Sequence, residues 1–358
     1  MAIFSKPRSP LAAFAWLTAL GTLGLIALGG LVTSHGAGMA VPDWPTTYGY
    51  NMFLFPVSQW VGGIFYEHTH RLYASVVGLL TVVLAVWIQI RARSEVAGLA
   101  RLGWFAVGLV VVQGVLGGLR VSLMKDQIGI LHASLAQAFL VLLVLLAVFL
   151  SPGWRNWRNN APSIPAPVAR WVTVATGMVF IQLVLGAAMR HQHAGLAVPD
   201  FPLAYGSLWP STDEAFLRGV NALRTDTRDF LPITAAHVHL HMTHRLFGLL
   251  TAGAVVVASF KLRRAFGTRS FPGRLGSVWM GLIGVQILLG ASTVWTNKAA
   301  DVATLHVVVG AICLGVGAWG AALSRVAARR RPVSTSAASL PATLHPTAGL
   351  AGAYRNHA

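Results

Sequence analysis

A cluster of polar side chains lies at the threshold of an apolar segment. Residues 67–71 read Glu-His-Thr-His-Arg and are followed directly by LYASVVGLLTVVLAVWIQI. Ionisable groups are costly at membrane depth and are usually kept there for a function. A carboxylate, two imidazoles and a guanidinium in one short stretch could bind a metal, exchange protons or pair with an anion. This stretch is therefore the first candidate site.

Part of this cluster recurs farther along the chain. The sequence AGMAVPDWPTTYG at 37–49 matches AGLAVPDFPLAYG at 194–206, and THRLYASVVGLLT at 69–81 matches THRLFGLLTAGAV at 243–255. The offset is 200 − 43 = 157 for the paired aspartates and 244 − 70 = 174 for the paired histidines. A Leu-His pair repeats with the second offset, because 306 − 132 = 174. The chain therefore contains two copies of one unit, an arrangement in which functional sites usually lie within or between the repeats.

Four histidines hold matching positions in the two copies. They are His70 and His132 in the first copy, and His244 and His306 in the second. Each copy should present two imidazoles at a similar depth, and such a pair across a helix bundle can bind heme iron from both faces. A metal ion without porphyrin is also possible, although two imidazoles leave the usual zinc shell incomplete. We predict one heme site in each copy.

The two copies differ at one chemically important position. Glu67 in the first copy is replaced by His241 in the second. Residues three apart share a helical face, so Glu67 should lie one turn from His70. The carboxylate could accept a proton or stabilise a developing cation, or it could orient an imidazole. His68 would add a second polar contact there.

An arginine follows one histidine of each pair directly. Arg71 and Arg245 would suit the propionates of a heme, whereas extension toward the membrane surface is the alternative. The second copy also contains the run HVHLHMTH, in which His237, His241 and His244 share a helical face. These histidines could form a copper or zinc relay, or the first two could be polar residues at an entrance.

Composition indicates that these residues belong to an integral membrane protein. Of the 358 residues, 55% are hydrophobic and 10% are charged, whereas soluble domains have roughly 25% charged residues. We predict an all-α membrane protein with eight transmembrane helices, arranged as two duplicated four-helix bundles. Apolar runs of about 20 residues, long enough to cross a bilayer, occur at 11–33, 67–90, 99–121, 127–150, 169–189, 235–260, 275–296 and 301–323.

The net charge of +17 does not indicate nucleic acid, because the basic residues lie in short blocks between the apolar runs. Most of these blocks fall on segments that would share one side of the membrane, which predicts cytoplasmic termini and histidines toward the outer side of the cell membrane. The single cysteine, Cys313, excludes an intramolecular disulfide.

The repeats also define the domains. We predict a first four-helix bundle at 1–150, a cytoplasmic linker at 151–168 and a second bundle at 169–325. Proline and arginine in the linker are typical of an exposed loop. The remaining residues, 326–358, are small, polar and proline-containing, which predicts a disordered cytoplasmic tail.

The duplicated pattern resembles the heme A synthases. The resemblance covers residues 11–325 and rests on EHTHR, on the repeated Thr-His-Arg and on the two Leu-His pairs. It implies that the protein oxidises a ring methyl of heme O to a formyl group through a hydroxymethyl intermediate, in the supply of heme A to cytochrome oxidase. Some members carry a cysteine pair in the first outer loop, but residues 34–66 contain none.

The resemblance also implies roles for the two copies. His244 and His306 would hold a heme b cofactor, whereas His70 and His132 would receive the heme O substrate. Glu67 corresponds to the acidic residue of the family's substrate site. Implied partners are membrane lipid, a heme O-forming prenyltransferase and an electron carrier.

Two other functions remain open at this point. In an electron-transfer cytochrome b, both bundles would hold permanent hemes near a quinone. In a transporter, the histidines would bind a metal or protons.

Overall fold

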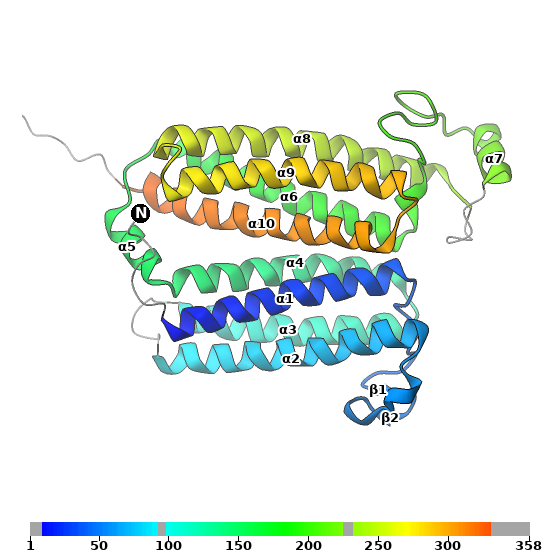
Figure 1. Ribbon diagram of the computed structural model, residues 1–358, viewed down its shortest axis with the longest axis horizontal. Coiled ribbons are helices and arrows are strands. Elements are labelled where there is room, and N and C mark those ends of the chain that lie inside the picture. Colours follow the sequence, from blue (N-terminus) through cyan, green and yellow to red (C-terminus); the bar gives the residue numbers. More distant parts are fainter. Residues whose placement is uncertain (1–8, 92–97, 225–231, 331–358) are drawn as a thin grey trace, which may run out of the picture.

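The computed structural model describes residues 9–91, 98–224 and 232–330. Within these ranges, eight helices are long and apolar enough to cross a membrane, which confirms the predicted all-α membrane fold. Figure 1 shows them side by side in two groups. They are α1 (Pro10–Ser34), α2 (Gly62–Arg91), α3 (Leu99–Ser122), α4 (Asp126–Phe149), α6 (Ala166–His191), α8 (Ala235–Phe266), α9 (Phe271–Trp295) and α10 (Ala300–Ala328).

Capping residues fix where several of these helices begin. The Ser9 hydroxyl accepts a hydrogen bond from the backbone of Ala12 at the start of α1, and a proline occupies the first turn. Helix α8 begins with a capping box formed by Thr234 and His237. Helix α9 is capped by Ser270.

Each group of helices forms a closed ring. Helix α1 packs on α2, α2 on α3, α3 on α4, and α4 on α1; the second group repeats this order with α6, α8, α9 and α10. Helices α2 and α4 therefore lie diagonally opposite in the first bundle, and α8 and α10 lie diagonally opposite in the second. Side chains that point inward from a diagonal pair face each other across the bundle interior.

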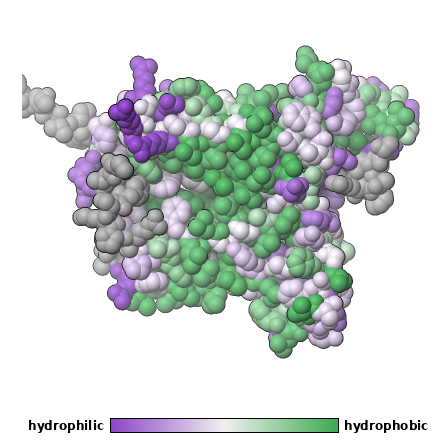
Figure 2. Space-filling view, in the orientation of Figure 1, coloured by the Kyte–Doolittle hydropathy of each residue, from purple (hydrophilic) through white to green (hydrophobic). Residues whose placement is uncertain are grey.

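The bundles meet through α1 and α4 of the first and α6 and α10 of the second. Helix α10 is the most buried of the eight spans, and small residues permit this close packing. A Cβ added at Gly30 would meet Thr304 at 2.9 Å, and one at Gly317 would meet Trp279 at 2.6 Å. The remaining helices lie on the outside, where Figure 2 shows a broad apolar band with hydrophilic residues gathered toward the two ends.

The segment between the bundles is more ordered than the sequence predicted. It contains helix α5 (Pro152–Asn160), whose Trp154 and Trp157 are buried. The Trp157 indole donates to the carbonyl of Leu323 near the end of α10, at 3.0 Å. Part of the predicted loop is therefore a helix, in which Trp157 binds the second bundle and Trp154 packs against Phe149 at the end of α4. The predicted disordered tail lies outside the described residues beyond 330, and its first residues, 326–328, belong to α10.

The opposite end of the molecule holds the longer connections, and we call it the loop end (Figure 1). Residues 35–61 and the described parts of 192–234 lie there. Their short elements are β1 (Thr46–Thr47), β2 (Tyr50–Asn51), η1 (Met52–Leu54), η2 (Val57–Gln59), η3 (Ala194–Leu196) and α7 (Glu214–Leu223). Strands β1 and β2 pair antiparallel, with Thr46 opposite Asn51.

Candidate functional site

The four repeated histidines meet in two pairs. His70 on α2 lies close enough to His132 on α4 for their charges to interact, and His244 on α8 does the same with His306 on α10. Both pairs come from diagonally opposite helices, and all four residues lie in the half of their helices nearer the loop end. The fold therefore gives each bundle one pair of imidazoles across its interior.

Each of these rings packs against a glycine of the preceding helix. A Cβ added at the glycine would lie 3.1–3.5 Å from the Cε1 atom of the ring. Any larger residue would press on the imidazole, so the glycines give the rings room to lie between the helices. The pairs are Gly29–His70, Gly117–His132, Gly186–His244 and Gly290–His306.

Three of the histidine-bearing turns are also held by a glutamine from the preceding helix. In each case the amide donates a hydrogen bond to the backbone carbonyl of the histidine, at 2.9–3.1 Å. An amide that bonds across helices fixes the height and rotation of the turn that it reaches. The pairs are Gln113–His132, Gln182–His244 and Gln286–His306. His70 has no such partner, because the repeat position of Gln182 (182 − 157 = 25) holds Leu25.

The donor set fits heme iron better than a bare metal ion. The Nδ1 atoms of His70, His132 and His306 are buried and have no hydrogen-bond partner in the described part of the chain. The same residues contain no group of three or more His, Cys, Asp or Glu that could hold a metal ion. A structural zinc ion usually needs four protein ligands, whereas the iron of a heme needs only axial ligands from the protein.

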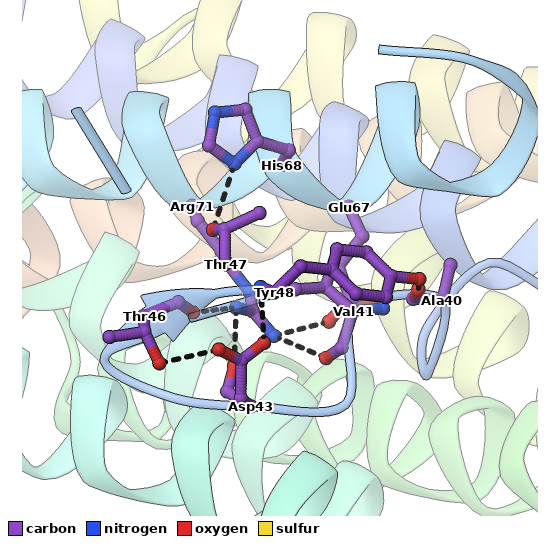
Figure 3. A network of polar contacts seen from close by, with 9 residues as sticks. All are labelled: Ala40, Val41, Asp43, Thr46, Thr47, Tyr48, Glu67, His68 and Arg71. Carbon is purple, nitrogen blue, oxygen red and sulfur yellow. Dashed lines mark hydrogen bonds and ion pairs between the residues drawn. The ribbon is translucent and has the colours of Figure 1, made fainter. Parts of the chain in front are cut away.

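Glu67 and Arg71 clamp the first loop onto α2 (Figure 3). Glu67 is only 4% exposed, and its carboxylate accepts from the backbone N–H of Val41 at 2.9 Å and from Arg71 at 2.8 Å. Arg71 also donates to the carbonyls of Val41, Asp43 and Thr46. This carboxylate therefore has a fixed position and fixed partners.

The second copy has the same clamp with histidine in place of glutamate. The backbone N–H of Val198 donates to His241 Nδ1 at 3.3 Å, and Arg245 donates to the carbonyls of Val198, Asp200 and Leu203. Position 67 and its counterpart 241 thus share one structural role. Both clamp arginines bind loop carbonyls, so the predicted pairing of Arg71 and Arg245 with heme propionates stays a prediction.

An aspartate organises the turn of each clamped loop. Asp43 accepts from the backbone N–H groups of Tyr48 and Gly49 and from the hydroxyl of Thr46. Asp200 accepts from the equivalent N–H groups of the second loop. Desolvation by burial acts to raise the pKa of Asp43, but the hydrogen bonds from Gly49, Thr46 and Tyr48 outweigh it and lower the pKa.

Substitution of Asp43 by alanine should loosen the first loop. The turn would lose its shared acceptor, and the expected cost is about 1–3 kcal/mol of local stability. Because folding lowers the pKa of Asp43, its contribution is present above the unfolded value of 3.8 and is lost as the pH falls below it. Limited proteolysis of residues 35–61 would detect the change.

Asp200→Ala is the matched control, because it removes the same turn from the second loop. It should leave cleavage of the first loop unchanged. Equal cleavage of the wild type and Asp43→Ala within residues 35–61 would contradict the assigned role.

His68 lies away from the paired histidines. It is fully buried, its Nδ1 lies 3.2 Å from the hydroxyl of Thr47, and its ring packs against Phe55 and Trp60. The predicted extra polar contact at the site was therefore wrong, because His68 faces the core of the first loop.

The other histidines before His244 diverge from one another. His237 caps the start of α8, His239 is exposed and lies near the ring of Trp209, and His241 holds the second loop. The described residues therefore do not form the metal relay that the sequence left open.

The chain is similar to one known protein family and to curated proteins. A family described as cytochrome oxidase assembly protein matches residues 55–317 of the chain, which include both histidine pairs and Glu67. The chain belongs to this family. Curated relatives of the chain are named heme A synthase. The one from Novosphingobium aromaticivorans is 27% identical over 87% of this chain and 94% of its own. The one from Sphingopyxis alaskensis is 29% identical over 92% and 95%.

Two arginines near the histidine pairs were not predicted from the sequence. The charge of Arg120 on α3 acts on both His70 and His132, and the charge of Arg190 on α6 acts on His306. Neither arginine is repeated, because the equivalent positions (120 + 286 − 113 = 293 and 190 − 157 = 33) hold threonine. The repeat therefore does not point to them, and both lie in the last turn of a helix, where a basic residue is common.

Arg190 also joins the two halves of the molecule. It donates to the carbonyl of Gly30 and the hydroxyl of Ser34 on α1, both at 2.8 Å, and to the carbonyl of Ala303 on α10 at 3.3 Å. The guanidinium therefore connects α6 of the second bundle with α1 of the first.

Proposed function

We propose that this protein is a heme A synthase that oxidises a ring methyl of heme O to a formyl group through a hydroxymethyl intermediate. One observation carries the proposal: two similar imidazole pairs lie across two bundles, and only the first copy has a carboxylate one turn from its histidine. The family supports it, because the curated relatives bear this name. The asymmetry favours a first bundle that binds the substrate and a second bundle that holds the cofactor.

In this proposal, the two bundles bind different hemes. His70 and His132 seat the heme O substrate in the first, and His244 and His306 hold heme b in the second. When bound, heme b supplies redox chemistry, and the protein supplies ligation, orientation and an electrostatic environment. A neighbouring glycine leaves room for each imidazole, and a glutamine holds the turn of His132, His244 and His306.

Glu67 is the proposed catalytic residue. Its carboxylate is held by the Val41 N–H and by Arg71, so it does not have to reorient when charge develops nearby. A fixed negative charge stabilises positive charge on the reacting methyl carbon, and the same oxygen atoms can take up a proton that this carbon releases.

The proposed setting is the cell membrane, with both termini in the cytoplasm and the loop end toward the outside. Heme O is apolar and would pass from a membrane-bound prenyltransferase, while a separate carrier exchanges electrons with the protein. No nucleic acid is involved.

Mass spectrometry of the extracted hemes tests this function. Purified protein that is supplied with heme O and an electron acceptor should contain heme b and should form the hydroxymethyl and formyl products. Recovery of unaltered heme O alone would overturn the proposal. Equal heme b occupancy of both bundles with quinol-dependent reduction would establish the cytochrome b alternative in its place.

Gln286→Leu should weaken heme retention in the second bundle. The variant removes the amide that fixes the carbonyl of His306, and loss of such supporting contacts typically costs about 10–100-fold in metal affinity. The heme-to-protein ratio after dilution in detergent measures the effect. Gln113→Leu is the control, because it should spare heme b and weaken substrate binding; equal heme b loss in both variants would contradict the assignment.

A further inference from the structure

Arg120 lies near the histidine pair of the first bundle, where the heme O substrate is proposed to bind. It belongs to α3, which carries neither histidine of the pair and packs against both α2 and α4. Its charge nevertheless acts on the rings of His70 and His132 alike. Arg120 is therefore near both rings, although it lies on a third helix.

The Arg120 guanidinium has a donor to spare. One of its Nη atoms donates to Asp126 at 2.9 Å, and the side chain is only 15% exposed. Its Nε is buried and has no hydrogen-bond partner among the described residues. A buried donor without a partner is costly, so this N–H favours binding of an acceptor that is not part of the chain.

The local charge balance also favours an anion. Two guanidinium groups, Arg120 and Arg190, and one carboxylate, Asp126, act together on His191 at the end of α6. His191 packs against α4, where its ring lies directly beside Gly129. Positive groups therefore outnumber the carboxylate around this histidine.

The loop above Arg120 leaves space for the guanidinium. A Cβ added at Gly38 would lie 2.5 Å from both Nη atoms of Arg120, so only glycine fits there without displacing them. Arg71, in contrast, binds three loop carbonyls and Glu67. Of the two arginines near the first histidine pair, Arg120 is the one with an unused buried donor.

We propose that Arg120 binds a carboxylate of the porphyrin substrate and so selects a ring that carries free acid groups. A guanidinium pairs with a carboxylate through charge-assisted hydrogen bonds, and the unpartnered Nε–H supplies one of them. This assignment rests on the proposed function, because it places the substrate between His70 and His132. It makes Arg120 a specificity-determining residue of that site.

Binding of heme O and of its dimethyl ester tests the proposal without turnover. The full-length protein, with its second bundle loaded, is titrated in detergent and followed by the absorbance of the bound heme. The wild type should bind the ester roughly 10–100-fold more weakly than the free acid, as expected for loss of a charge-assisted hydrogen bond. In Arg120→Gln this ratio should fall below about threefold, and Arg120→Lys should restore part of it.

Arg101→Gln is the matched control, because Arg101 lies on the same helix at its other end and is exposed. It should keep the wild-type ratio. Equal affinity of the wild type for acid and ester would overturn the role of Arg120 while the heme A synthase function stands, and it needs no variant to be seen. Binding of neither compound would overturn the proposed function and this proposal together.

Discussion

His306→Ala should leave the purified protein with at least about tenfold less heme b than the wild type. Alanine removes one of the two axial ligands from the proposed cofactor site, and supporting contacts alone can change metal affinity by about 10–100-fold. The neighbouring Gly290 offers no side chain that could replace the imidazole. The heme absorption spectrum, normalised to protein concentration, measures the loss.

His239→Ala is the control for this experiment, because His239 is exposed and lies outside both pairs. It should retain the wild-type pigment. If His306→Ala retained the full amount of heme, the assignment of the heme b site to the second bundle would be wrong. Thermal unfolding of both variants in detergent separates loss of heme from loss of the fold.

Glu67→His should bind heme O but form heme A about 10²–10⁴-fold more slowly, the range typical of a lost general acid or base. The second copy shows why the fold should tolerate this change. His241 occupies the equivalent position and accepts from the Val198 N–H, as Glu67 does from Val41. The substitution therefore keeps the loop anchor and removes the carboxylate. The rate of formyl heme production, measured by mass spectrometry, gives the result.

Glu67→Gln is the companion variant, because it keeps the size and one oxygen acceptor but not the charge. It should be slowed to a similar extent. If Glu67→His makes heme A at the wild-type rate while its first loop stays resistant to protease, the carboxylate only holds the loop.

The sequence was sufficient to predict the eight spans and the two histidine pairs. Apolar length sets the spans, and the offset of 174 isolates the histidines from the nine others in the chain. In the ring order, with α2 opposite α4 and α8 opposite α10, consecutive membrane helices are neighbours. The connections from α2 through α4 and from α8 through α10 are short, as expected for antiparallel neighbours, whereas those after α1 and α6 are long. It is this order that turns equivalent positions into facing pairs.

The clamps could not be predicted in the same way. Arg71 and Arg245 bind mostly backbone carbonyls. Because every residue has such a carbonyl, the residue types do not show which one an arginine binds. An arginine beside a presumed heme ligand therefore led to propionates as the expected partner. The helix in the linker was not predicted either, because Pro and Arg are typical of an exposed loop, whereas Trp154 and Trp157 in this segment are buried.

Arg190 has a consequence for how the chain is assembled. If the halves came apart, its guanidinium would lose its acceptors on Gly30 and Ser34, at a cost of about 1–3 kcal/mol. If the two bundles were made as separate chains, the second would be inserted with Arg190 lacking these acceptors. The first would be inserted with Gly30 and Ser34 of α1 lacking their donor. A continuous polypeptide keeps Arg190 close to its acceptors on α1 and so avoids that stage.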